Sequence, residues 1–143
     1  MTFLKEDKKM NSEYEKIFVD NIVVKGKRKK LKSGLEKERK RKDTISKMCR
    51  DFPEYIDELK VIRQGRELTR NEIMEIINMY DPQKEAYIIC WQDEYDGMRF
   101  ATSQALGIIF DEGMASVMIL KRLVIIKEEQ GYGQPMIYVC RVD

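Results

Sequence analysis

The 143-residue chain has no histidine and only three cysteines, three prolines and one tryptophan, and these scarcities exclude several kinds of protein. Without histidine, no Ser-His-Asp or Cys-His nucleophilic system can form, and no zinc site can use imidazole ligands. The cysteines lie roughly 40 to 50 residues apart, which indicates isolated buried thiols in a reducing compartment rather than a disulfide framework or a metal cluster. The chain also lacks the glycine-rich motifs that bind nucleotide phosphates. The sequence therefore predicts a protein that is not an enzyme and that has no metal and no cofactor.

Long apolar runs are missing as well. No stretch approaches the roughly 18 apolar residues that a membrane-spanning helix needs, and the first ten residues are too charged for a secretory signal. We therefore expect a cytoplasmic protein with no membrane partner. The length predicts one compact domain, or one small domain with an extended arm.

The charge is abundant but unevenly placed. The chain has 27 Lys and Arg against 25 Asp and Glu, a formal net charge of +2. Residues 25–42 alone have eleven basic against two acidic side chains and a net charge of +9. The segments 1–24, 43–82 and 83–143 have net charges of −1, −3 and −3. The sequence is thus a mildly acidic body with one concentrated cationic segment.

Such a cationic segment repels itself, and we expect it to be extended or only partly helical before it meets a polyanion. Its positive charges could neutralise nucleic-acid phosphates and release counterions, they could meet an acidic protein or lipid surface, or they could simply form a solvated face. No aromatic residue interrupts the segment, so it offers no surface on which bases could stack. The predicted phosphate contacts of this basic arm are Lys25, Lys27, Arg28, Lys29, Lys30, Lys32, Lys37, Arg39, Lys40, Arg41 and Lys42.

The pattern after the arm predicts helices. Ile45, Met48, Cys49 and Phe52 recur at helical spacing, and residues 33–36 have the spacing of a capping box that would start this helix. A second helix is expected from Pro53 to Gly65, through residues 55, 59 and 62. The sequence at 69–72 is a stronger capping box, and it predicts a third helix that ends before residue 82. The apolar stripes of residues 43–82 would serve either as a homodimer contact or as part of the monomer's own core.

The last sixty residues predict two more helices and a β-hairpin. Residues 86–95 fit one buried helix that ends at a turn at 95–97, and residues 111–123 fit a second helix with apolar positions Val117, Leu120 and Leu123. Two β-rich runs, 124–129 and 136–142, flank a glycine-containing loop and predict a hairpin. A winged helix-turn-helix has this order of elements, with helices followed by a two-stranded hairpin.

Residues 105–139 resemble the helix-turn-helix and wing of MarR-type regulators. The wing is most similar to those of plasmid and phage replication initiators, which have a GLIERxRQGxGxPNRxYV pattern. The matching residues are Ile125, Ile126, Lys127, Glu129, Gln130, Gly131, Gly133, Pro135, Ile137, Tyr138 and Val139. The resemblance implies a mainly α fold with a C-terminal β-hairpin (α+β), in which a basic arm and additional helices precede a winged helix-turn-helix.

In that fold, residues 111–123 would enter the major groove as the recognition helix. Its outward face would present Met114, Ser116, Met118, Lys121 and Arg122 to DNA. The wing loop would contact the DNA backbone or the minor groove through Gln130, Tyr132 and Gln134.

These observations predict three segments: an N-terminal segment (1–42) with the basic arm (25–42), a helical region (43–82) and a winged helix-turn-helix (83–143). The leading hypothesis is a small protein that binds double-stranded DNA, either a transcriptional regulator or a replication accessory factor of a mobile element. A phage-type protein that binds and modulates a nucleic-acid-handling enzyme is an alternative. RNA binding is another, because the arm does not discriminate between nucleic acids.

Overall fold

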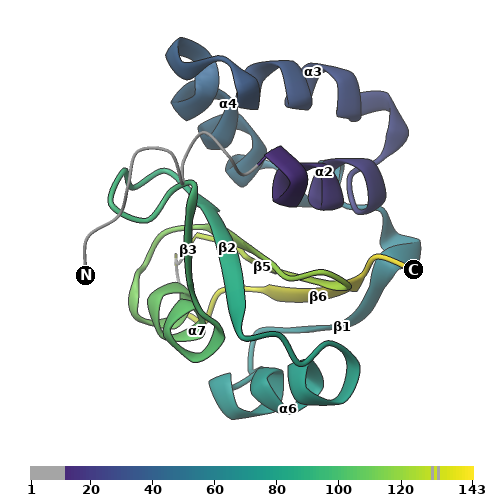
Figure 1. The fold of residues 1–143 in the computed structure, drawn as a ribbon, viewed down its shortest axis with the longest axis vertical. Coiled ribbons are helices and arrows are strands. Elements are labelled where there is room, and N and C mark those ends of the chain that lie inside the picture. The colour runs from purple at the N-terminus through teal and green to yellow at the C-terminus, as the bar shows by residue number, and fades with distance from the viewer. Residues whose placement is uncertain (1–11, 130, 132) are drawn as a thin grey trace.

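A six-stranded antiparallel sheet with helices on both faces forms the protein in the computed structural model, which describes residues 12–129, 131 and 133–143 (Figure 1). The helices are α2 (Ser12–Asn21), α3 (Lys25–Glu36), α4 (Glu38–Arg50), α5 (Phe52–Tyr55), α6 (Arg70–Tyr80) and α7 (Thr102–Asp111), with a 3-10 turn, η1 (Glu58–Lys60). The strands are β1 (Val61–Gly65), β2 (Glu85–Cys90), β3 (Met98–Ala101), β4 (Ser116–Ile119), β5 (Leu123–Lys127) and β6 (Ile137–Arg141).

The strand order across the sheet is β1-β6-β5-β4-β2-β3. Three of the five neighbouring pairs are consecutive in the chain, and each of these hairpins is antiparallel. β2 pairs with β4. β1 forms the edge of the sheet opposite β3 and pairs there with the last strand, β6. A bulge between Val61 and Arg63 interrupts the β1 pairing at this edge.

Two groups of helices cover the sheet, one on each face. We call α2–α5 the N-terminal cover and α6 with α7 the second cover; they lie above and below the sheet in Figure 1. Alternate residues of each central strand point into the two covers, as their pleat requires. In β2, for example, Tyr87 and Ile89 pack under the N-terminal cover, whereas Ile88 and Cys90 pack under the second cover.

This architecture contradicts the predicted winged helix-turn-helix. The residues expected to form two helices, 86–95 and 111–123, instead contain the central strands β2 and β4. Both faces of these strands are buried, so their sequences are continuous apolar runs without polar alternation, and such runs cannot be distinguished from buried helices by periodicity. The hairpin of β5 and β6 is confirmed, but it is part of a large sheet rather than a separate wing.

Other local predictions have mixed outcomes. The capping box at Thr69 is confirmed: its hydroxyl accepts from the Glu72 N–H, and the Glu72 carboxylate accepts from the Thr69 N–H. The helix through Ile45 and Met48 is confirmed as α4. The helix expected from Pro53 to Gly65 is wrong, because this stretch divides into α5, η1 and β1.

None of the helices in the described part of the chain combines the length and the apolar composition that crossing a lipid bilayer requires.

Candidate nucleic-acid interface

The cationic segment forms two regular helices, α3 and α4, rather than the extended arm expected from its charge. Leu31 and Leu35 on α3, and Ile45 and Met48 on α4, are buried in the core of the N-terminal cover. Burial of these side chains supplies the free energy that overcomes the repulsion between the cations, which the two helices leave on their outer faces. The backbone positions from which these cations project are therefore fixed.

Gly34 allows α3 and α4 to pack closely. A Cβ atom at this position would lie 2.2 Å from the Thr44 Oγ1 atom and 2.8 Å from its Cγ2 atom. The capping box predicted at residues 33–36 is wrong, because Gly34 is a buried residue inside α3 and does not start a helix. The small residue thus serves the contact between the two cationic helices.

Five of the eleven predicted arm residues make contacts with the protein's own groups. Arg28 donates from Nε to the Val23 carbonyl at 2.8 Å, and Lys32 pairs with Asp20 at 2.9 Å. The ammonium groups of Lys27 and Lys42 lie 4.8 Å from the Tyr55 ring centroid and 4.4 Å from the Trp91 ring centroid. The fifth residue, Arg41, belongs to an internal ion-pair network.

Arg41 joins three parts of the molecule. Its guanidinium donates to both carboxylate oxygens of Asp96, at 2.7 and 3.0 Å, and to both carboxylate oxygens of Glu15, at 3.0 and 2.6 Å. It also donates to the Leu35 carbonyl at 3.0 Å, and the Tyr87 hydroxyl donates to the Glu15 carboxylate. We call Arg41, Glu15, Asp96 and Tyr87 the Arg41 network. It connects α4 to α2 and to the loop between β2 and β3.

Two members of this network, Arg41 and Tyr87, have shifted pKa values. Burial disfavours the charge on Arg41, but the hydrogen bonds to Asp96 and Glu15 outweigh burial and raise the pKa of Arg41 above its ordinary value. Burial, followed by the charge of Glu15, raises the pKa of Tyr87. Arg41 is therefore a structural cation and is not available to a ligand.

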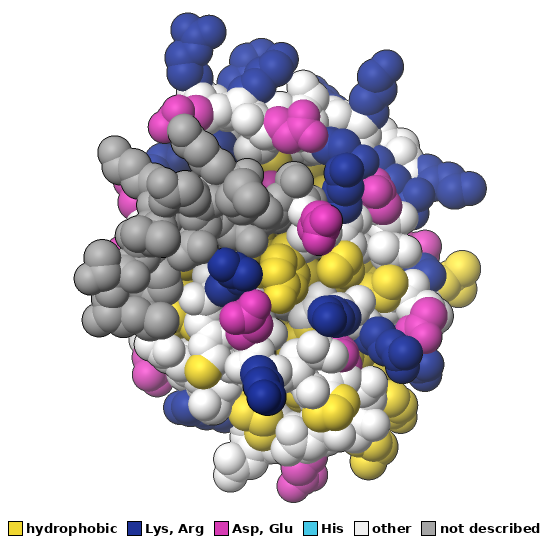
Figure 2. Space-filling view, in the orientation of Figure 1, with side chains coloured by type: hydrophobic (Ala, Val, Ile, Leu, Met, Phe, Trp, Pro, Cys, Tyr) yellow, Lys and Arg dark blue, Asp and Glu magenta, His cyan; other side chains and the backbone are white. Residues whose placement is uncertain are grey.

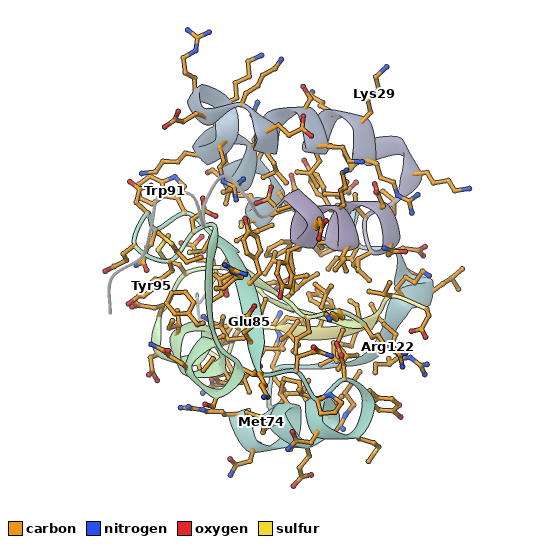
Figure 3. All side chains as sticks on the ribbon, viewed as in Figure 1. Lys29, Met74, Glu85, Trp91, Tyr95 and Arg122 are labelled. Carbon is orange, nitrogen blue, oxygen red and sulfur yellow. The ribbon has the colours of Figure 1, made fainter. Side chains whose placement is uncertain are left out.

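The six remaining arm residues form an exposed cationic surface at the end of the molecule built by α3 and α4. Among the residues that the structure describes, no carboxylate pairs with any of their side chains. We call this surface the cationic cap; it consists of Lys25, Lys29, Lys30, Lys37, Arg39 and Lys40. Figure 2 shows Lys and Arg side chains standing out from this end, and Figure 3 shows Lys29 pointing away from the body.

A hollow of about 400 Å³ lies beside the cap on α3. Arg28, Lys29 and Lys32 line it together with Ser33 and Glu36. Lys29 and Ser33 offer hydrogen-bond donors that suit a phosphate group. Arg28 and Lys32 add positive charge although each already contacts a group of the protein, and the carboxylate of Glu36 opposes an anion. The cap and this hollow together are the candidate interface.

Trp91 is a residue whose surroundings the sequence did not reveal. It follows β2 and lies beneath α4 in Figure 3, where Lys42 covers part of its ring. Lys42 also pairs with Asp93 at 3.0 Å. The only sequence signal was that Trp91 directly follows a buried apolar run, and nothing in the sequence placed that run beside the cationic segment.

The residues assigned to the recognition helix lie elsewhere than expected. Ser116 and Met118 are buried within β4, and Met114 is half-buried just before that strand. Lys121 and Arg122 are exposed, but they form the turn between β4 and β5. Since residues 111–123 do not form a helix, the structure does not bring these five side chains together on one exposed face.

The predicted wing residues are only partly within the described structure. Gln130 and Tyr132 lie outside the described residues. Gln134 is exposed, and its backbone carbonyl accepts from Arg66 at 3.0 Å. Its role in binding stays a prediction.

Two buried polar side chains elsewhere have structural roles. The Asp81 carboxylate accepts from the backbone N–H groups of Arg122 at 2.6 Å and Leu123 at 3.2 Å, which fixes the β4–β5 turn. Lys127 donates to the carbonyls of Glu112 and Met114, and burial lowers its pKa. Within the described residues, no group of acidic or cysteine side chains is arranged to hold a metal ion.

In comparisons with known proteins, no protein-family model, curated protein or solved structure matches this chain. The assignment of function therefore depends on the chemistry of the surface described above.

Proposed function

We propose that this protein binds nucleic acid through the phosphates of its backbone, using the cationic cap. The observation that supports the proposal is the set of six exposed cations on two rigid helices, for which the described residues supply no carboxylate partner. Bringing like charges together costs folding free energy, so an unpaired set of this size is best accounted for by an anionic ligand. Each phosphate neutralised by such a cation releases a counterion, which provides affinity at moderate salt.

The proposed binding is largely independent of base sequence. Lys ammonium groups contact phosphates as point charges and carry no information about base identity. This mode suits a DNA-binding accessory factor in replication or transcription better than a regulator that reads a specific operator. It does not involve the recognition helix inferred from the resemblance, because that helix does not exist in this fold.

The test is binding of a fluorescently labelled oligonucleotide at several salt concentrations between about 50 and 200 mM. In the cap variant, Lys29, Lys30 and Lys40 are each replaced by Gln. We expect it to lose affinity on the order of a hundredfold, and the slope of log affinity against log salt to fall by roughly 2 to 3. Single-stranded DNA, duplex DNA and RNA of the same sequence form the three arms.

A control variant removes the same amount of charge from the other side of the molecule. Arg63, Arg70 and Lys84 are exposed and lie outside the N-terminal cover, and their replacement by Gln also lowers the net charge by three. We expect its affinity to stay within about threefold of the wild type. Arg63 loses its pair with Glu72 and Arg70 its contact with the Ser103 carbonyl, but at the cap only long-range electrostatics change. Equal losses in the two variants, or no binding of any nucleic acid at low salt, would overturn the proposal.

A further inference from the structure

Trp91 is the single tryptophan of the chain and 47% of it is exposed. Tryptophan has a large apolar surface, and leaving it in water forgoes the stabilisation that its burial would give. Isolated exposed apolar residues are common, so exposure alone does not indicate a site. What distinguishes Trp91 is its surroundings, which combine cations, a hollow and a rigid support.

The support comes from the Arg41 network. The Cys90 N–H, one residue before Trp91, donates to the Asp96 carboxylate at 3.3 Å, and Arg41 of α4 holds the same carboxylate. The loop that begins with Trp91 is thereby fixed against α4, the helix that contributes Arg39 and Lys40 to the cationic cap. Trp91 and the cap consequently form one continuous surface.

A single row of side chains along α4 connects the cap to Trp91. Arg39, Lys42, Ser46 and Arg50 follow one another at intervals of three or four residues, so they are neighbours on the helix surface. Arg39 belongs to the cap, Lys42 lies 4.4 Å from the centroid of the Trp91 ring, and Ser46 and Arg50 continue past it. A polyanion bound to the cap would be directed towards the ring along this row.

Beside Trp91 lies a hollow of about 370 Å³, a volume in the range of small-molecule sites. Its lining includes Ser46, Cys49, Arg50, Trp91, Met114 and Glu129. Met114 and Cys49 supply apolar surface, while Ser46, Arg50 and Glu129 offer both donors and acceptors. This mixture suits a nucleobase, which has apolar faces and an edge of alternating donors and acceptors.

We propose that an unpaired base of single-stranded nucleic acid stacks on Trp91 beside this hollow, while the phosphates of the same strand lie on the cationic cap. The inference rests on the proposed function and names its substrate class. Bases within a duplex stack on one another and cannot reach a tryptophan ring, whereas the bases of a single strand can be splayed onto aromatic side chains. The protein therefore prefers single strands to duplex, and DNA and RNA strands share the chemistry that it recognises.

The first test uses Trp91 itself as the reporter. A single-stranded DNA oligonucleotide of about 15 nucleotides, unlabelled, is titrated into the full chain while tryptophan fluorescence is recorded. We expect quenching that saturates at the same concentration as binding measured by anisotropy with a labelled oligonucleotide. The duplex of the same sequence should bind more weakly and quench less, and the matching RNA strand separates a DNA ligand from an RNA ligand.

The second test uses variants and labelled oligonucleotides. Trp91→Leu should weaken single-strand binding about tenfold and change duplex binding by less than about twofold, because stacking is lost while the phosphate contacts remain. Trp91→Phe retains an aromatic face and should recover part of the loss. Tyr80→Leu is the matched control: Tyr80 is also exposed (42%) and lies 5.3 Å from the Arg141 guanidinium, but it belongs to α6. We expect no change in its affinity.

The outcomes separate the two proposals. If no nucleic acid binds at low salt, both are overturned. If strands bind with the salt dependence of the cap, but Trp91 fluorescence is unchanged and Trp91→Leu binds normally, only the stacking site is overturned. Equal weakening of single-strand and duplex binding by Trp91→Leu would also overturn it. If Trp91→Leu fails to fold by circular dichroism, the wild-type quenching and the Trp91→Phe variant still decide the question.

Discussion

The two helical covers bury opposite faces of the same sheet with similar chemistry, yet their outer surfaces differ in charge. Both contribute aliphatic and aromatic residues to continuous apolar clusters, and the central strands supply alternate residues to each. On the outside, α6 has Arg70 with Glu72 and Glu75, and α7 has Asp111 alone. Along residues 25–42, the outer surface of α3, α4 and the residue between them has the six cations of the cationic cap against two exposed carboxylates, Glu36 and Glu38.

This difference in surface charge shows which cations the fold requires and which it does not. Because the second cover seals its face of the sheet without a cationic exterior, covering a sheet does not require one. The cap is therefore an addition to the fold, whereas Arg41, from the same run of sequence, is part of the fold. Four experiments test this distinction, in order of decreasing expected change in stability.

Replacing Arg41 by Met should reduce the free energy of unfolding by about 3 to 5 kcal/mol, because Glu15 and Asp96 are then left buried without a counter-charge. Urea unfolding at neutral pH measures the change. Arg39→Met, two residues earlier on the exposed face of α4, should change stability by about 0.5 kcal/mol or less. A loss below about 1 kcal/mol for Arg41→Met would show that the network does not hold α4 against the rest of the protein.

Replacing Gly34 by Ala should destabilise the protein by about 2 kcal/mol, although alanine has the higher helix propensity. The added Cβ atom would lie 2.2 Å from Thr44 Oγ1, so α3 and α4 must separate. Gly26→Ala on the same helix meets no atom within 4 Å and should be neutral or slightly stabilising. Thr44→Ala in the Gly34→Ala background should restore much of the lost stability; equal stability of the two single alanine variants would refute the close contact.

The thiols under the two covers provide a pH-dependent comparison. Burial raises the pKa of both Cys90 and Cys140 to about 12, and these residues lie beneath the second and N-terminal covers respectively. An unfolded chain releases these protons near pH 8.5 to 9, so the stabilising effect is complete below that pH and is lost as pH rises towards 12. Between pH 8 and 10, each thiol should account for about 1.5 kcal/mol of lost stability.

Urea unfolding of Cys90→Ala and Cys140→Ala, measured at both pH values, tests whether the two covers exclude water equally well. Each variant should lose about 1.5 kcal/mol less than the wild type over this interval. A clearly smaller difference for one variant would identify the cover that admits solvent.

The smallest effect is expected for the cationic cap itself. The variant with Gln at positions 29, 30 and 40 should keep the wild-type stability within about 0.5 kcal/mol, or gain slightly because repulsion among the cations is relieved. The same urea titration decides this point. A loss above about 1 kcal/mol would mean that the cap contributes to the fold, and the separation of fold from function would fail.

Some local signals in the sequence predicted local structure correctly, whereas the capping box at 33–36 and the helix from Pro53 to Gly65 did not. The Thr69 capping box and the β5–β6 hairpin depend on residues close together in the chain, and the structure contains both. The β4–β5 turn had no such signal. Lys121 and Arg122 form it without glycine, asparagine or proline, and the group that fixes their turn is the carboxylate of Asp81, about forty residues earlier. Without a visible turn, Val117, Leu120 and Leu123 matched a helix.

The candidate site could likewise be predicted from the sequence only where it depends on residues close together in the chain. The cationic segment could be identified from the sequence because its charged residues are close together in the chain. The sequence could not show that Arg41 is internal, since its partners Glu15 and Asp96 are 26 and 55 residues away. Trp91 was missed for the same reason, and the aromatic surface that the cationic segment lacks is provided by a distant loop.

The strand order has a consequence for how the protein is made on the ribosome. β1 pairs only with β6, and β6 lies between β1 and β5 although it is the last of the strands to be synthesised. The nascent chain must therefore keep β1 unpaired while more than seventy residues are added after it. Both helical covers can be synthesised before β6 emerges, so pairing of β1 should follow formation of the rest of the sheet.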